Sequence, residues 1–290
     1  MNTLWRPEFE KDSCGVGFVA DVSGKPSHRI LRMAIQGVCC VTHRGAVSAD
    51  AKTGDGAGIL TQLPRKLLAR ELYRMGHPKA NPQDLGVGVF FLPQDPSNRS
   101  AAKGIADRIV REQGLTHYGW REVPVNPDVL GDKALTTMPA IQHLLVGSGT
   151  FSPGASRHGE KVPDPFSQFE RALYYTRRLI ERAFAQARLE SAYIPSFSSR
   201  TIVYKGLLVA PQLNRFYEDL TDPSFETAIA VFHQRYSTNT FPNWVLAQPF
   251  RYLGHNGEIN TLLATGTGCG RGSRSCAPRS GATGSRISSR

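Results

Sequence analysis

One cysteine in the sequence stands where it could act as a nucleophile. Cys14 opens an apolar, glycine-containing run, CGVGFVA, which predicts a buried strand over residues 14–20. A thiol attacks a carbonyl as its thiolate, and the pKa of an ordinary cysteine is about 8.5, so the thiol needs a base. If the peptide bond before Cys14 is cut, the freed α-amine, with a pKa of about 7.7–8.0, can serve as that base. The alternative is that Cys14 is simply part of the core.

A second group of polar residues, far along the chain, could stabilise an oxyanion. His255 to Glu258 read HNGE and follow a predicted strand. The side-chain amide of Asn256 and the backbone N–H of Gly257 could both donate to a tetrahedral oxygen, and Glu258 could receive a substrate ammonium group. The alternative is that Asn-Gly forms only a hairpin turn.

An arginine lies at the end of an apolar run. Arg235 closes the segment AIAVFHQR, whose first five residues predict a strand. A guanidinium there could form a two-pronged pair with an α-carboxylate. The alternative is a surface arginine at a strand end.

The elements that must position these residues follow from the hydrophobic periodicity. Strands are expected over residues 14–20, 59–63, 85–92, 120–125, 143–146, 197–204 and 228–232. Helices are expected over residues 27–41, 101–113 and 166–191, with Ser27 as an N-cap. Strands and helices do not alternate regularly, which favours an α+β fold over a doubly wound sheet.

The composition argues against several other classes of protein. No apolar run approaches the ~18 residues of a membrane span, and residues 1–13 do not resemble a secretory signal, so we expect a cytoplasmic protein without membrane contact. The net charge is +11, but residues 264–290 hold five Arg and no acid, so we expect no nucleic-acid binding. None of the five cysteines shows C-x-x-C spacing, so we expect neither zinc nor disulfides. The adjacent Cys39 and Cys40 are expected to be buried.

Longer segments carry a resemblance to a known family. They read CGVGFVA, HRGAVSADAKTGDGAGIL, SRTIVYKG and FHQRYSTNTFPNWVLAQPFRYLGHNGEINTL. These resemble the class II glutamine amidotransferase domain at the N-terminus of the glutamate synthase large subunit, from about Asp12 to Leu263. The resemblance implies the four-layer αββα sandwich of two antiparallel sheets found in N-terminal-nucleophile hydrolases. It also implies an enzyme that hydrolyses L-glutamine to glutamate and ammonia.

The resemblance implies which residues react. Cys14 matches the nucleophile, which is exposed when a propeptide of residues 1–13 is removed. Asn256 and Gly257 match the oxyanion hole.

The resemblance also implies which residues bind the substrate. Arg235 matches an arginine that holds the α-carboxylate of glutamine, with Thr238 on the same loop. Glu258 matches an acid that contacts the amino group of the substrate. Arg44 and Gly45 match an HRG segment that lies against the nucleophile and orders the site.

In the family, the ammonia travels to a second site, where it converts 2-oxoglutarate to glutamate. The resemblance therefore implies a role in glutamate biosynthesis and ammonia assimilation. FMN and an iron–sulfur cluster are expected in other domains of the full-length enzyme, and an FAD-containing small subunit is its expected partner. We expect no cofactor and no metal in this chain.

The composition changes after Leu263. Residues 264–290 are rich in Gly, Ser, Thr and Arg, which predicts a disordered tail. Family members continue at this point with a sequence similar to GNRNWMRARE. A GC-rich coding of that sequence, read one base later, gives ATGTGCGRG, as in residues 264–272. We therefore expect a frameshifted tail, and an amidotransferase domain over residues 14–263 that is incomplete at its C-terminal end.

Two alternatives remain open at this point. The chain could be an amidotransferase that serves another acceptor, although residues 241–253 favour glutamate synthase. It could also be an inactive truncated fragment.

Overall fold

The computed structural model describes residues 15–50, 52–149, 165–234 and 241–251. These residues form an α+β fold with two antiparallel sheets of four strands each. The strands are β1 (Val16–Ala20), β2 (Ala57–Gln62), β3 (Leu85–Leu92), β4 (Thr116–Glu122), β5 (Ala140–Gly147), β6 (Tyr193–Ser198), β7 (Thr201–Gly206) and β8 (Ile229–Gln234). The α-helices are α1 (His28–Cys40), α2 (Arg65–Arg74), α3 (Pro96–Glu112), α4 (Asp132–Thr136), α5 (Pro165–Gln186) and α6 (Leu213–Phe216). Short 3-10 helices are η2 (Thr42–Arg44), η3 (Pro82–Asp84), η4 (Pro127–Val129), η5 (Ala210–Gln212) and η6 (Glu218–Thr221).

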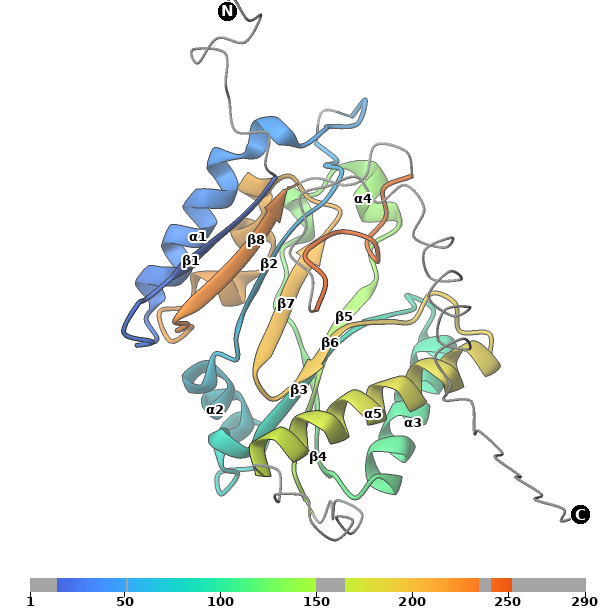
Figure 1. The fold of residues 1–290 in the computed structure, drawn as a ribbon. Coiled ribbons are helices and arrows are strands. Elements are labelled where there is room, and N and C mark those ends of the chain that lie inside the picture. The colour runs from blue at the N-terminus through green and yellow to red at the C-terminus, as the bar shows by residue number, and fades with distance from the viewer. Residues whose placement is uncertain (1–14, 51, 150–164, 235–240, 252–290) are drawn as a thin grey trace, which may run out of the picture. The chain divides into compact units, whose positions relative to one another are not determined.

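The sheets lie between two groups of helices (Figure 1). The first sheet has the strand order β1-β8-β2-β7, and α1 packs against β1 and β8. The second sheet has the order β4-β5-β3-β6, and α3 and α5 pack against it. The expected α+β class and the pair of antiparallel sheets are therefore confirmed.

Both faces of the second sheet are buried. Phe90 and Leu92 of β3 point toward α3 and α5, whereas Val89 and Phe91 join a separate cluster. This alternation follows from the two-residue period of a strand. It explains why all eight residues of β3 are buried and apolar or glycine.

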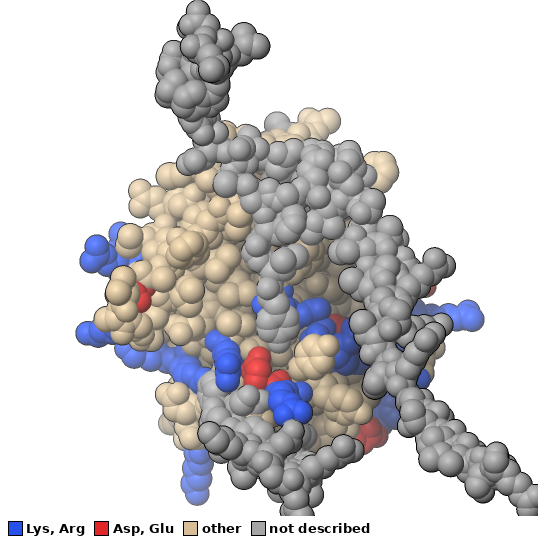
Figure 2. All heavy atoms as spheres, in the orientation of Figure 1, with Lys and Arg blue, Asp and Glu red and all other residues tan. Residues whose placement is uncertain are grey.

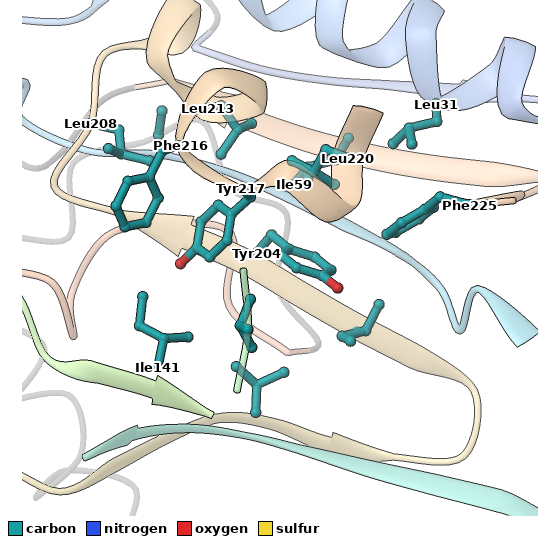
Figure 3. Close-up of a cluster of buried hydrophobic side chains, with 14 of the residues drawn as sticks. Leu31, Ile59, Ile141, Tyr204, Leu208, Leu213, Phe216, Tyr217, Leu220 and Phe225 are labelled. Atoms are coloured by element: carbon teal, nitrogen blue, oxygen red, sulfur yellow. The ribbon is translucent and has the colours of Figure 1, made fainter. Parts of the chain in front are cut away.

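The separate cluster joins the two sheets (Figure 3). It brings together Leu31 of α1, Ile59 of β2, Tyr204 of β7 and Ile141 of β5. Each side chain is at most 5% exposed. Because this cluster contains residues from both sheets, the burial of its apolar surface fixes one sheet against the other.

The other face of the first sheet is more open. Gly17 lies against the ring of Phe232, on the side of α1, so Phe18 points to the opposite side. Phe18 is 72% exposed, and few charged side chains lie where β1 and β8 run (Figure 2).

The expected single strand over residues 197–204 is wrong, because the chain turns at Ser199 and Arg200. This turn separates β6 of the second sheet from β7 of the first. Glu170 of α5 holds it: its carboxylate accepts hydrogen bonds from the Ser198 hydroxyl at 2.6 Å and from the Ser199 N–H at 2.7 Å. The turn therefore depends on a side chain of the preceding helix, 28 residues earlier in the sequence.

Several other boundaries differ from expectation. The helix α3 begins at Pro96 rather than residue 101, because Asp95 caps it and accepts the N–H of Asn98 at 2.8 Å. The strand β4 begins at residue 116 rather than 120, and α5 ends at Gln186 rather than 191. The expectation that Cys40 is buried is also wrong: its side chain is exposed, while Cys39 is half-buried.

A buried ion pair ties η6 to the second sheet. Arg121 of β4 donates to both carboxylate oxygens of Asp219, at 2.9 and 2.7 Å, and to Glu71 of α2 at 3.0 Å. The hydroxyl of Tyr204 donates to the same carboxylate at 2.8 Å. Burial lowers the pKa of the neighbouring His143 to about 3, and the charge of Arg121 acts in the same direction. His143 is therefore neutral at pH 7.

We expect Asp219→Ala to lower the free energy of unfolding by about 3–5 kcal/mol, because it leaves the Arg121 charge buried without its main partner. Urea unfolding at pH 7 measures this. Glu226→Ala is the matched control, since its partner Lys66 has a side chain that is 66% exposed. That exposed pair should contribute under about 1 kcal/mol. Equal losses in the two variants would contradict the prediction.

Candidate active site

Four strand ends meet at one end of the first sheet. The antiparallel register pairs Val16 with His233, and the N–H of Gln234 donates to the carbonyl of Gly15 at 2.7 Å. Gln234 also lies opposite Ala57, the first residue of β2, and Ala57 lies opposite Gly206, the last residue of β7. Residues from distant parts of the sequence are thus brought together at this point.

Two of the predicted site residues adjoin this meeting point along the chain. Cys14 immediately precedes Gly15, and Arg235 immediately follows Gln234. Cys14 and Arg235 themselves lie outside the described residues. The hydrogen bond between Gly15 and Gln234 therefore brings together the residue after Cys14 and the residue before Arg235. In the sequence, 220 positions separate Cys14 from Gln234 (234 − 14).

The HRG segment packs on the end of β8. Arg44 is the last residue of η2, and its side chain lies outside the described part of the structure. Gly45 donates its N–H to the carbonyl of Thr42 at 3.0 Å. A Cβ at Gly45 would collide with the side-chain amide of Gln234 and would lie 3.2 Å from Asp55 Oδ1. Glycine therefore lets this turn approach the buried side chain of Gln234 closely, and a larger residue would require that side chain to shift.

The loop between the HRG segment and β2 folds back on itself. The N–H of Asp55 donates to the carbonyl of Ala46 at 3.1 Å, and the N–H of Ser48 donates to the carbonyl of Thr53 at 2.8 Å. Asp50 accepts from both the hydroxyl and the N–H of Thr53, and these bonds lower the pKa of Asp50 to about 2. The carboxylate therefore stays ionised at neutral pH and holds the loop that leads into β2.

The 241–251 segment covers β2 and β7 and leads toward the predicted oxyanion hole. The carbonyl oxygen of Gln248 lies 2.5 Å from where a Cβ at Gly58 would be, so only glycine at position 58 leaves room for it. Trp244 packs over Gly206 and donates its indole N–H to the carbonyl of Ala134 at 3.1 Å. Asn256, Gly257 and Glu258, and also Thr238, lie outside the described residues.

Two buried amides at this site were not anticipated from the sequence. Gln234 is fully buried, and among the described residues neither its side-chain oxygen nor its side-chain nitrogen has a hydrogen-bond partner. The same holds for Oε1 of Gln248. Buried amide groups without partners are rare. One feature of the sequence could have indicated Gln234: it is a polar residue at the end of the apolar strand AIAVFHQ, next to the predicted site residue Arg235.

Among the described residues, no three His, Cys, Asp or Glu side chains are grouped as metal ligands would be. None of the helices in the described ranges has the length and apolar character needed to cross a bilayer.

Comparison with known proteins decides the family. The model of the class-II glutamine amidotransferases matches residues 14–269. The chain belongs to this family. The matched segment begins at the residue predicted to be the nucleophile and ends beyond Leu263.

Curated relatives of this amidotransferase include glutamate synthases. The ferredoxin-dependent glutamate synthase 2 of Synechocystis sp. is 46% identical over 254 residues, which are 88% of this chain and 15% of that protein. The glutamate synthase [NADPH] large chain of Azospirillum brasilense is 45% identical over 259 residues, or 89% of this chain and 16% of the relative. The large chain from Bacillus subtilis is 39% identical over a similar share. This amidotransferase chain thus spans about one sixth of the length of these relatives.

We expect Gly45→Ala to reduce glutaminase activity at least tenfold, because the added Cβ pushes the HRG turn away from Gln234, and small displacements at a reacting centre cost about that much or more. The free energy of unfolding should fall by about 1–3 kcal/mol. Gly104→Ala in α3 is the control, since nothing lies within 4 Å of its added Cβ. Wild-type activity in Gly45→Ala would show that the turn does not need this close contact.

Proposed function

We propose that this chain hydrolyses L-glutamine to glutamate and ammonia, with Cys14 as the nucleophile after residues 1–13 are removed. The observation that carries the proposal is the pairing of Gly15 with Gln234. It supports a site in which the thiol of Cys14 and the guanidinium of Arg235 come from neighbouring strands. The start of the family match at residue 14 supports the same cleavage point.

The proposed reaction begins with binding of the substrate. Arg235 pairs with the α-carboxylate of glutamine, with Thr238 beside it, and Glu258 receives the α-ammonium group. Arg44 and Gly45 order the loop beside the nucleophile. These contacts place the side-chain amide of the substrate against Cys14.

Two chemical steps follow. The Cys14 thiolate attacks the amide carbon, and the side-chain amide of Asn256 and the N–H of Gly257 donate to the oxyanion. The α-amine of Cys14 passes a proton to the departing nitrogen, so the C–N bond breaks and ammonia leaves. Water then attacks the γ-glutamyl thioester, which releases glutamate and restores the thiol.

We further propose that the ammonia serves glutamate synthesis. All three relatives compared above carry the name glutamate synthase, and their names include ferredoxin or NADPH. In a full-length enzyme, the ammonia would pass to a synthase site that aminates 2-oxoglutarate. FMN and an iron–sulfur cluster would bind in domains outside this chain, and an FAD-containing small subunit would be the partner. The chain itself would need no cofactor and would act in the cytoplasm.

We expect the isolated chain to lose a mass equal to residues 1–13 and to release ammonia from glutamine. Cys14→Ala should abolish the release, by more than about a thousandfold, because no other group can form the thioester. Intact mass spectrometry and an ammonia assay measure the two effects. Cys40→Ala is the matched control, since that cysteine is exposed and lies at the end of α1.

Three outcomes decide between the alternatives. Activity retained in Cys14→Ala would contradict the nucleophile. A chain that keeps residues 1–13 and has no activity would be an inactive fragment. The third outcome concerns an enzyme reassembled with its synthase domains. If it releases ammonia but transfers none to 2-oxoglutarate, the result would favour another acceptor.

A further inference from the structure

A buried lysine lies next to the catalytic end of the first sheet. Lys205, the penultimate residue of β7, is 1% exposed. Its Nζ donates a hydrogen bond to the carbonyl of Val245 at 2.8 Å. The same atom lies 5.0 Å from the ring centroid of Tyr193 and 4.8 Å from that of Phe250. A buried amino group without partners is strongly unfavourable, so these contacts account for its place in the fold.

Two of the three contacts go to the 241–251 segment. Val245 and Phe250 belong to this segment, whereas Tyr193 is the first residue of β6. Lys205 therefore connects the segment to both sheets, since β7 lies in the first and β6 in the second.

The register places this connection directly beside Gly58. Lys205 lies opposite Gly58 on β2, and Gly58 lies opposite His233 on β8. The Cβ of Lys205 is 2.6 Å, and the carbonyl oxygen of Gln248 2.5 Å, from where a Cβ at Gly58 would be. The lysine and the segment thus fill the space that this glycine leaves.

The other end of the segment is held separately. Arg251 donates hydrogen bonds to the carbonyls of Ile194 and Pro195, and its Nη2 lies 3.8 Å from the carboxylate of Glu181. Only four residues separate Arg251 from Asn256 (252–255). The position of the segment therefore limits where Asn256 and Gly257 can reach.

We propose that Lys205 is a positioning residue for the oxyanion hole: it holds the 241–251 segment across β2 and β7, so that the donors of Asn256 and Gly257 are fixed when the oxyanion forms. This inference rests on the proposed function. Lys205 touches no reacting atom and acts through the carbonyl of Val245 and the chain that follows it.

The role does not depend on the charge of the lysine. Burial lowers the pKa of Lys205 well below its ordinary value, and the charge of Arg251 acts in the same direction. Both the ammonium and the neutral amine carry N–H groups that can donate to a carbonyl.

Lys205→Met tests the proposal, because methionine keeps the apolar stem and removes the donor. We expect hydrogen exchange in peptides from residues 241–251 to become about tenfold faster, because the hydrogen bond between Lys205 and the carbonyl of Val245 is lost. We expect kcat for glutamine hydrolysis to fall at least about tenfold, toward the roughly hundredfold lost when an oxyanion donor is removed. The KM should rise by a smaller factor than kcat falls, because the contact of the substrate α-carboxylate with Arg235 is retained. The rate of Cys14 alkylation by iodoacetamide should stay within about twofold, since that reaction forms no oxyanion.

Two variants serve as comparisons. Lys66→Met makes the same substitution at an exposed lysine and should change none of these quantities. Phe250→Leu removes one ring beside the amine without removing the donor, and should change exchange and kcat in the same direction by a smaller factor. It tests the same contact if Lys205→Met does not fold.

The outcomes separate the inference from the function on which it rests. The inference would be overturned if Lys205→Met changed neither the hydrogen exchange of residues 241–251 nor kcat. Parallel losses of kcat, substrate binding and Cys14 alkylation would also overturn it, since they indicate general unfolding. A wild-type chain without glutaminase activity would contradict the proposed function, whereas the exchange measurement would still show whether Lys205 holds the segment.

Discussion

The pairing of β8 with β1 on one side and β2 on the other is the constraint on which the rest of the site depends. β8 comes last among the described strands, and yet it lies inside the first sheet. Its register places Gln234 against Gly15 and Ala57 together. A slip of one residue would move every side chain of β8 to the other face of the sheet. The buried Phe232 and the close contact of Gly45 with Gln234 oppose such a slip.

Two groups of contacts hold this sheet end in place, and a third lies farther away. The HRG turn and the loop after it pack on β8 from the side of Gly45. The 241–251 segment covers β2 and β7 and is held through Trp244, Lys205 and Arg251. Farther away, the Arg121–Asp219 pair joins η6 to the second sheet. A site built in this way can be rigid although its residues come from distant parts of the sequence, because each part packs against a sheet rather than only against its neighbours.

The sequence predicts best where a structural element depends on its own residues. The run LGVGVFFL predicts β3 over residues 85–92, which the structure confirms, because every position is apolar or glycine and buried. The turn at Ser199 could not be predicted in this way, since it holds no Gly, Pro or Asn. It depends on the carboxylate of Glu170 and on the Ser198 hydroxyl, which accepts the N–H of Arg200. The position of Gln234 beside Gly15 and Gly45 could not be predicted either, because it follows from the strand register of the folded chain. The family is confirmed, whereas the roles of Cys14, Arg235 and Asn256, and the frameshifted tail, stay predictions.

The proposed function requires that Cys14, freed at its N-terminus, is the group that attacks the glutamine side chain. The most direct test is labelling with a glutamine analogue that carries a chloromethyl ketone in place of the amide. Peptide mapping then identifies the modified residue. We expect one label, on Cys14, in a peptide that begins with that residue, and protection by excess glutamine. A label on Cys39 or Cys40 instead, or on Cys14 with residues 1–13 still attached, would contradict it.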